Sequence, residues 1–167
     1  MKQTNEACTL FYMQHITQRR AKLQDLPRIV ELLLEDELGK LRESVSQELN
    51  KRYIDAFHRI DNDPNQYLMV VEETNEIIAA CHLTTLPSLT FIGSSRLQIE
   101  AVRVAKKYRD KGVGQWMLNQ AIEYAKNHGI DIIQLTTNKK RERAKHFYEK
   151  LGFEATHEGM KLYLRNR

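Results

Sequence analysis

The stretch YRDKGVGQWMLNQAIEYA, Tyr108–Ala125, has two glycines at the start of an apolar pattern with helical spacing. The pattern predicts a helix that runs to about Asn127 and is ended by Gly129. Glycine in a helix costs up to about 1 kcal/mol relative to alanine, so Gly112 and Gly114 need a physical reason. Unpartnered N–H groups at a helix start, together with the helix dipole, form a site for anions. The alternative is a turn that needs glycine only for its backbone dihedral angles.

Basic residues are concentrated in the part of the chain that contains this stretch. Residues 101–150 hold 12 Lys/Arg and 5 Asp/Glu, a net charge of +7, whereas the other residues hold 14 and 17, a net charge of −3. This block predicts an anionic partner, either nucleic acid or a phosphorylated small molecule. Its densest run, NKKRERAK at 138–145, has no interleaved aromatic residue, so we expect no nucleic acid. The glycine loop also lacks the Gly-Lys-Ser/Thr of a Walker loop and the third glycine of the dinucleotide fingerprint.

The composition is ordinary for a globular protein. The 167 residues are 41% hydrophobic and 29% charged, which predicts one domain. We expect no membrane partner, because no apolar run reaches the length of a membrane span and the first residues lack the apolar core of a signal peptide. Cys8 and Cys81 lie far apart and have no metal-ligand spacing, so we expect no metal and a cytoplasmic chain with reduced thiols.

The order of the expected elements predicts a single-domain α/β fold with a mixed central sheet and about four helices. We expect this domain at 15–167, after an N-terminal extension of residues 1–14. Strands are expected near 16 and at 67–73, 77–86, 95–108 and 131–137, and helices at 25–34, at 48–60, from the glycine pair to 127 and at 141–151. Two further short strands are expected at 153–157 and 160–164.

Three segments of the chain resemble a known family. RDKGVG at 109–114 matches the signature Q/R-x-x-G-x-G/A, IEAVRV at 99–104 is similar to the central strand before it, and HFYEKLGFE at 146–154 is similar to a segment of pattern FYxxxGF. Together they resemble the GNAT superfamily of acetyl-CoA-dependent N-acetyltransferases. The resemblance covers roughly 98–154, and the element order of the whole chain is compatible with it.

The resemblance implies a binding site for acetyl-CoA. Backbone amides of the glycine loop would hold the pyrophosphate, and backbone groups of the preceding strand would hold the pantetheine arm. The loop residues are Arg109, Asp110, Lys111, Gly112, Val113 and Gly114, and the strand residues are Val102, Arg103 and Val104. The two valines are also typical core side chains, and both interpretations can hold because one concerns the backbone.

The segment before the last helix departs from the family pattern. Many members have asparagine three residues before the small residue of this helix, whereas this chain has Arg141 three residues before Ala144. Asn138, the nearest asparagine, is the candidate for a cofactor contact. The basic run at 139–145 would hold the 3′-phosphate of CoA, or it forms a solvated helix face.

Tyr148 is the candidate general acid. Acetyl transfer expels CoA thiolate, and a phenol with a pKa of about 10 can protonate a thiolate whose conjugate acid has a pKa of about 8.5. The alternative is a core residue, because Tyr148 shares a helical stripe with Phe147 and Leu151. The FYxxxGF match favours the general acid.

Glu100 is the candidate general base. An amine must lose a proton before it attacks, and a carboxylate on the central strand can accept this proton, directly or through water. Strand alternation places Glu100 on one face with Val102 and Val104. A structural ion pair or an exposed strand end explains the residue equally well. His82 is a further polar candidate, with a satisfied core histidine as its alternative.

The predicted function is acetyl transfer from acetyl-CoA to a primary amine by direct attack in a ternary complex. The resemblance places the acceptor site at the first two helices and the strand loops, within 31–87, which contain acidic segments. These favour a cationic amine over an acidic one, although solvated surface charge explains them equally well. A small-molecule acceptor is the predicted class. The alternatives are a protein amine as acceptor and a CoA-binding module without catalysis. The resemblance also implies a homodimer, with EATHEGMKLYL at 154–164 as a pairing edge.

Overall fold

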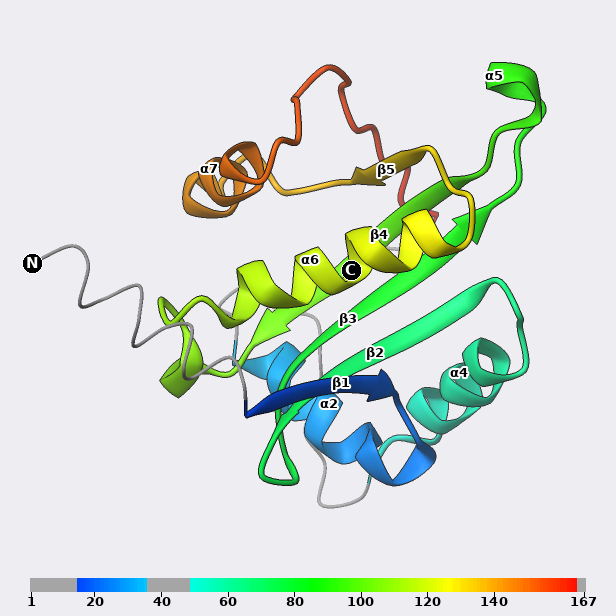
Figure 1. Ribbon diagram of the computed structural model, residues 1–167. Coiled ribbons are helices and arrows are strands. Elements are labelled where there is room, and N and C mark those ends of the chain that lie inside the picture. Colours follow the sequence, from blue (N-terminus) through cyan, green and yellow to red (C-terminus); the bar gives the residue numbers. More distant parts are fainter. Residues whose placement is uncertain (1–14, 36–48, 165–167) are drawn as a thin grey trace, which may run out of the picture.

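The computed structural model describes residues 15–35 and 49–164 as a five-stranded sheet with helices on both faces (Figure 1). The strands are β1 Ile16–Arg20, β2 Gln66–Glu73, β3 Glu76–Leu86, β4 Arg96–Val104 and β5 Ile132–Leu135. The helices are α2 Leu26–Leu34, α4 Lys51–Asp61, α5 Thr90–Gly93, α6 Val113–Asn127 and α7 Glu142–Lys150, with the 3-10 helices η1 Leu23–Asp25 and η2 Lys106–Tyr108. The predicted α/β fold is confirmed, whereas the expected extension at residues 1–14 lies outside the described residues.

The sheet is mixed, as the sequence predicts. Its strand order is β1-β2-β3-β4-β5. Neighbouring strands are antiparallel from β1 to β4, and β5 is parallel to β4. A parallel pair needs a crossover connection, and α6 forms it, with the glycine loop at its start. The tight turn between β2 and β3 has Thr74 and Asn75 at φ angles of 49° and 67°, the left-handed pair of a two-residue hairpin.

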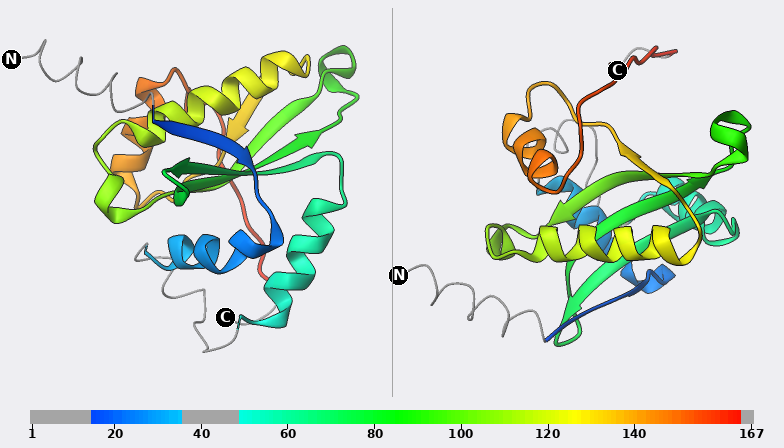
Figure 2. Two further views of the ribbon diagram at one scale, coloured as in Figure 1. Left: turned by 60° about the horizontal axis from the view of Figure 1, so that its bottom comes forward. Right: turned by 45° about the horizontal axis from the view of Figure 1, so that its top comes forward.

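Helices cover both faces of this sheet (Figure 2). α6 lies on one face, and α2 and α4 lie on the other. In α2 the side chains of Leu26, Ile29 and Val30 are buried at helical spacing, so one stripe of the helix packs on the sheet. The buried residues of α6 are Val113, Met117, Leu118, Ala121 and Ala125. Because both faces are covered, the middle of β2 and of β3 is buried almost continuously.

β4 carries a β-bulge near its centre. Ala80 of β3 lies opposite Arg103, and His82 lies opposite Glu100, so β4 has one residue more than β3 between these pairs. Ala101, in the bulge, has a φ of 50°, a left-handed conformation that is uncommon for alanine. Bulges bend the strand and re-aim its side chains, and they are frequent next to active sites.

The bulge corrects the strand alternation that we expected. Glu100 and Arg103 both lie opposite residues of β3 that face α2 and α4, so these two side chains share one face. The sequence predicts that Glu100 shares a face with Val102 and Val104, and this prediction is wrong. Val104 lies on the other face, where its Cγ2 approaches Gly114 of α6. The extra residue shifts the alternation by one position.

The end of the chain also differs from the expectation. The sequence predicts short strands at 153–157 and 160–164, but the structure has no strand in either range. The side chains of Met160, Leu162 and Leu164 are 94%, 86% and 87% exposed. A strand needs a hydrogen-bonding neighbour as well as alternating apolar residues, and this segment has no such neighbour within the described part of the chain.

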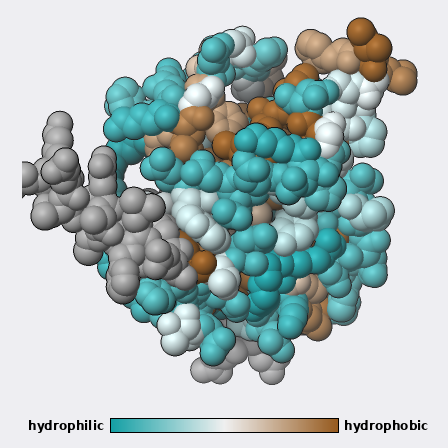
Figure 3. Space-filling model, in the orientation of Figure 1, coloured by the Kyte–Doolittle hydropathy of each residue, from teal (hydrophilic) through white to brown (hydrophobic). Residues whose placement is uncertain are grey.

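The loop between β3 and β4 carries α5, which the sequence does not predict. Leu89, Phe91 and Ile92 are 98%, 71% and 105% exposed, and they form an apolar tip that appears in brown in Figure 3. Phe91 and Ile92 have left-handed φ angles of 51° and 59°. Among residues 15–35 and 49–164, no helix combines the length and the apolar character of a membrane-spanning helix.

Candidate functional site

The glycine loop between η2 and α6 leaves the backbone accessible at the start of α6. Gly112 is the N-cap residue, and its φ of 86° is a left-handed conformation that favours glycine. Asp110 is also left-handed, with a φ of 60°. Because the N-cap has no side chain, no such group accepts the first N–H groups of α6. These donors and the positive end of the helix dipole suit an anion.

Gly114 lies where the first turn of α6 meets β4 and α7. A Cβ atom at this position would lie 3.4 Å from Cζ of Phe147 and 3.5 Å from Cγ2 of Val104. Both are ordinary van der Waals distances, so a side chain as small as that of alanine would fit at this position. The two glycines therefore differ, since the backbone conformation favours glycine at Gly112, whereas the packing around Gly114 does not require it.

β4 and β5 separate beyond the first half of β4. Their pairing ends at Ile99 and Leu135. The backbone N–H of Ala105 donates to β3 at 2.8 Å, so by alternation Val102 and Val104 direct their backbone groups toward the opposite edge. This open edge is the part of β4 that the sequence assigns to the pantetheine arm.

Guanidinium groups contact both carbonyl oxygens of the open edge. Nη1 of Arg103 donates to O of Val102 at 2.8 Å, and Nε of Arg109 donates to O of Val104 at 3.0 Å. Nη2 of Arg109 also donates to O of Glu35, at the end of α2, at 3.3 Å. The Arg109 side chain therefore faces β4 and α2, although its backbone belongs to the glycine loop.

The other charged side chains of the glycine loop also contact protein groups. Nζ of Lys111 lies 5.4 Å from the centre of the Tyr108 ring. The carboxylate of Asp110 accepts a hydrogen bond from Nη2 of Arg143 in α7 at 3.2 Å. Val113 is fully buried, so it can offer only its backbone. The predicted pyrophosphate contacts of this loop are therefore assigned to its backbone amides and not to its side chains.

Tyr148 lies in α7 and packs with its ring against other aromatic rings. The ring centroids of Phe147 and Phe153 lie 5.3 Å and 6.0 Å from that of Tyr148. Burial raises the pKa of the Tyr148 phenol, and the positive charges of Arg103 and Arg141 oppose this change. The phenol therefore keeps its proton at neutral pH. Tyr148 is also partly buried against the hydrophobic core.

Glu100 and His82 lie opposite each other on β4 and β3. Glu100 is exposed, and His82 is half-buried. Nε2 of His82 is buried and has no hydrogen-bond partner among the described residues. Burial lowers the pKa of the His82 imidazole, and the charge of Glu100 opposes this change, so the ring is neutral at pH 7. The structure thus brings together the two polar residues that the sequence marks as candidates near the substrate.

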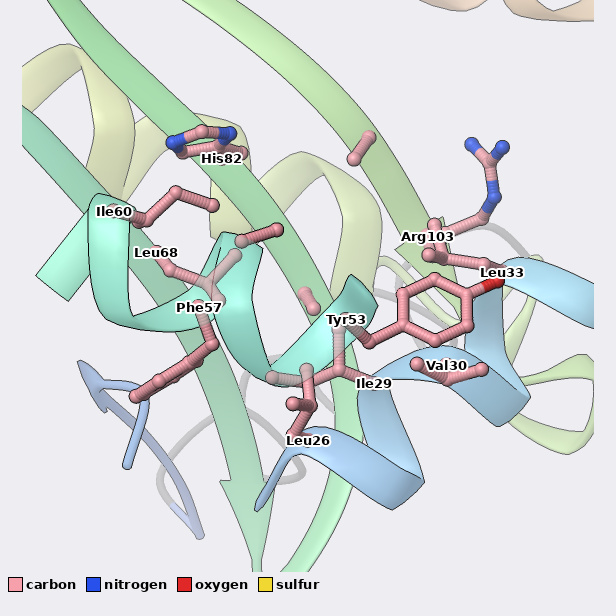
Figure 4. Close-up of a pocket in the computed structure, with 13 residues that line it drawn as sticks. Leu26, Ile29, Val30, Leu33, Tyr53, Phe57, Ile60, Leu68, His82 and Arg103 are labelled. Atoms are coloured by element: carbon pink, nitrogen blue, oxygen red, sulfur yellow. The ribbon is translucent and has the colours of Figure 1, made fainter. Parts of the chain in front are cut away.

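A pocket of about 170 Å³ lies on the same face, between the sheet and helices α2 and α4 (Figure 4). Ala101 and Arg103 line it from β4, and His82 lines it from β3. The two helices supply most of its apolar wall, including Leu33 and Tyr53. The resemblance predicts an acceptor site in this region, but the apolar faces of the two helices are typical of core residues and do not reveal the pocket. Tyr53, which adds a polar tip to such a face, was the available signal.

Asn138 forms the turn that leads into α7. Its Oδ1 accepts the backbone N–H of Lys140 at 2.9 Å, and its carbonyl accepts the backbone N–H of Arg141 at 2.8 Å. A contact of Asn138 with a cofactor stays a prediction. Lys139 pairs with Glu158 at 2.8 Å, and both side chains are exposed. This agrees with a solvated surface for the start of the basic run.

The glycine loop and the open edge fit a ligand that is long, with phosphate at one end and amide groups along its length. The first N–H groups of α6 suit the phosphate. The backbone groups of Val102 and Val104 can exchange hydrogen bonds with amides, as a neighbouring strand would. The two parts adjoin, because Val104 lies against Gly114 in the first turn of α6. Acetyl-CoA has this distribution of groups.

A model of the acetyltransferase (GNAT) family matches residues 26–153, which include β4, the glycine loop, α6 and α7. The chain belongs to the GNAT acetyltransferase family. The resemblance and the fold predicted from the sequence are thereby confirmed, and the GNAT fold uses acetyl-CoA as its acetyl donor. Acetyl transfer is the activity of this family.

Individual relatives agree with the GNAT assignment. The uncharacterized N-acetyltransferase YhfO of Bacillus subtilis is 27% identical over 139 residues, which are 81% of this chain and 88% of YhfO. A shorter match, at 39% identity, is with an uncharacterized N-acetyltransferase of Methanocaldococcus jannaschii and covers 34% of this chain and 25% of that protein. Another, at 46% identity, is with streptothricin acetyltransferase A of B. subtilis and covers 33% of this chain and 32% of that protein. The crystal structure of a transcriptional regulator from Bacillus halodurans has a TM-score of 0.87 at 42% identity, and the match covers 90% of this chain and 100% of that one.

Proposed function

We propose that the chain moves the acetyl group of acetyl-CoA to the primary amine of a small molecule, by direct attack while both substrates are bound. The observation that carries this proposal is the position of the bulge in β4. The open backbone edge leads from the start of α6 to the bulge, and Ala101 of the bulge lines the pocket. A donor along the edge and an acceptor in the pocket therefore meet at one point of β4.

Acetyl-CoA supplies an activated acetyl thioester. Glu100 accepts a proton from the substrate ammonium, directly or through water, so that the amine nitrogen gains the lone pair with which it attacks. The hydroxyl of Tyr148 donates its proton to the departing sulfur. Backbone groups of Val102 and Val104 orient the donor, and the pocket walls orient the acceptor.

The size of the pocket supports a small acceptor. A volume of about 170 Å³ is similar to that of a cavity of about 150 Å³ that binds a molecule of the size of benzene. A lysine side chain of a protein is the alternative acceptor. The two are distinguished by comparing free amines with a lysine-containing peptide at equal concentration of primary amine.

The experiment measures release of the CoA thiol from acetyl-CoA with a panel of amines, for the wild type and Tyr148→Phe. The variant keeps the ring and its packing and removes only the proton donor. We expect kcat to fall about 10²-fold, at the lower end of the range for general acid catalysis, with unchanged affinity for acetyl-CoA. Because burial raises the pKa of Tyr148, its deprotonation should not limit the rate between pH 7 and about 9.

Glu100→Gln serves as the companion variant. It should raise the pH at which the reaction becomes fast, because the amine must then lose its proton to solvent. If Tyr148→Phe keeps kcat within about twofold while chemistry limits the rate, Tyr148 is a packing residue and the proton reaches sulfur by another route.

A second candidate is a CoA-sensing regulator without catalysis. The observation in its favour is the transcriptional regulator from B. halodurans, at 42% identity. Calorimetric binding of acetyl-CoA without thiol release for any amine or peptide would support the sensor and contradict the enzyme.

A further inference from the structure

We infer that the acceptor is a small monoamine with an apolar body, and that polyamines and aminoglycosides are poor acceptors. This inference rests on the proposed acetyl transfer and on the pocket between α2, α4 and the sheet as the acceptor site. It names the substrate class that this pocket selects.

Apolar side chains form most of the pocket wall. Of the thirteen lining residues, three carry a polar group, namely Tyr53, His82 and Arg103. Figure 4 shows Phe57, Ile60 and neighbouring aliphatic side chains grouped below the imidazole of His82. Burial of apolar surface contributes about 25 cal/mol per Å², so a hydrocarbon group gains free energy here that a hydrated group does not.

The charge of the lining disfavours a second ammonium group. The guanidinium of Arg103 is always protonated, and burial keeps the imidazole of His82 neutral at pH 7. None of the described lining residues is acidic. A second ammonium that moved from water into the pocket would therefore find no carboxylate there to pair with. Removing an unpaired charge from water is costly.

The acidic residues described within 31–35 and 49–87 do not change this charge balance. Glu31 pairs with Arg28 at 3.0 Å, and Asp55 pairs with Lys51 at 2.8 Å. Glu35, at the end of α2, accepts the backbone N–H of Lys106. These carboxylates pair with basic side chains or with backbone N–H groups, and none of them lines the pocket. Among the described residues, the acidic composition that favours a cationic acceptor therefore does not extend to the pocket wall.

The test compares pentylamine with cadaverine, two primary amines with the same five-carbon chain. They differ only at the far end of the chain, where pentylamine has a methyl group and cadaverine has another ammonium. We expect kcat/KM for pentylamine to exceed that for cadaverine by at least about tenfold, because the methyl group gains from burial and the ammonium loses its hydration. Spermidine and kanamycin should behave like cadaverine.

A charge placed in the wall should reverse this preference. Leu33→Glu adds a carboxylate to the pocket from α2, and Ala56→Glu adds one from α4, so one variant suffices if the other does not fold. The matched control is Leu34→Glu, at the next position of α2, which is partly buried but does not line the pocket. We expect the kcat/KM for pentylamine divided by that for cadaverine to fall at least about tenfold in a pocket variant. The same ratio should stay unchanged in the control.

Binding of the products provides a readout without turnover. N-pentylacetamide should bind more tightly than N-acetylcadaverine by calorimetry. If an amine is acetylated but cadaverine or spermidine is as good a substrate as pentylamine, the inference is wrong and the proposed function stands. If acetyl-CoA binds and no amine is acetylated, the proposed function fails, and the inference fails with it.

Discussion

At the scale of single residues, His82 links the candidate site to pH. Burial lowers its pKa below the ordinary value of 6.5, so the folded protein binds a proton here less readily than the unfolded chain. The neutral ring therefore contributes stability that is present above about pH 6.5 and is lost as the pH falls through the lowered pKa. We expect the melting temperature of the wild type to fall more between pH 7.5 and pH 5 than that of His82→Gln, by scanning calorimetry.

The comparison between the two proteins isolates His82, because the other titrating groups are common to both. His58, an exposed histidine of α4, provides the matched control as His58→Gln. Equal falls in melting temperature for wild type and His82→Gln would show that the imidazole is solvated in the folded state.

The two glycines of the loop should respond differently to alanine. At Gly112 the φ of 86° would force alanine into a left-handed conformation, which costs about 1–2 kcal/mol. At Gly114 a Cβ would meet side chains at 3.4 Å and 3.5 Å, distances of ordinary contact. We expect Gly112→Ala to lower the free energy of unfolding by about 1 kcal/mol and Gly114→Ala to leave it unchanged within about 0.5 kcal/mol, by urea unfolding.

The same pair separates structure from binding at the start of α6. Gly112→Ala should also weaken acetyl-CoA binding, because the strained turn redirects the N–H groups that face the phosphate. A larger loss of stability for Gly114→Ala than for Gly112→Ala would contradict this difference between the two positions.

At the scale of elements, the bulge of β4 determines which groups reach the pocket. Ala101 has a φ of 50°, where glycine is free of strain and a β-branched residue is not. We expect Ala101→Gly to keep acetyl transfer and to raise the free energy of unfolding by up to about 1 kcal/mol. Ala101→Val should lower it by more than about 1 kcal/mol and reduce kcat/KM, because the larger side chain also fills the pocket.

Thermal unfolding and the thiol-release assay measure both effects. Val102→Ala, at the neighbouring position on the other face of β4, is the control for a change in side-chain volume outside the pocket. If Ala101→Val is as stable and as active as the wild type, the bulge is not a strained part of the site.

At the scale of the whole molecule, we propose that the chain forms a homodimer through its C-terminal segment. Met160, Leu162 and Leu164 alternate along the segment and are almost fully exposed. β5 is the last strand in the sheet order, and within the described residues it pairs only with β4. A second copy can supply the missing neighbour, which would bury the apolar side chains and hydrogen-bond the strand edge. Light scattering at micromolar concentration should give twice the chain mass of 19.6 kDa.

A double variant, Leu162→Lys with Leu164→Lys, should shift this mass to that of a monomer, because charges would then occupy the buried face of the pairing. Ile92→Lys, in the equally exposed apolar tip of α5, is the matched control and should leave the mass unchanged. A monomeric mass for the wild type would rule out the dimer. A monomer for Ile92→Lys alone would place the interface at the apolar tip.

The sequence by itself determined those features that depend on neighbouring residues. Helical spacing predicted the main helices to within a few residues, and the strand patterns at 67–73 and 77–86 predicted β2 and β3. The strand, glycine loop and helix around Gly112, with the FYxxxGF segment, were enough to indicate the family. Such patterns are local, because propensities, caps and turn conformations involve residues a few positions apart.

Only the tertiary structure decided how distant segments meet. The bulge at Ala101 exists because β3 and β4 pair in a particular register, and no pattern within β4 announces it. This register places Glu100 on the face of Arg103, whereas strict alternation predicted the opposite. In the same way, only the tertiary structure brings Phe147 of α7 beside Gly114, and the alternating residues of 160–164 form no strand without a neighbour. Each of these depends on non-local pairing or packing, which sequence patterns a few residues long do not contain.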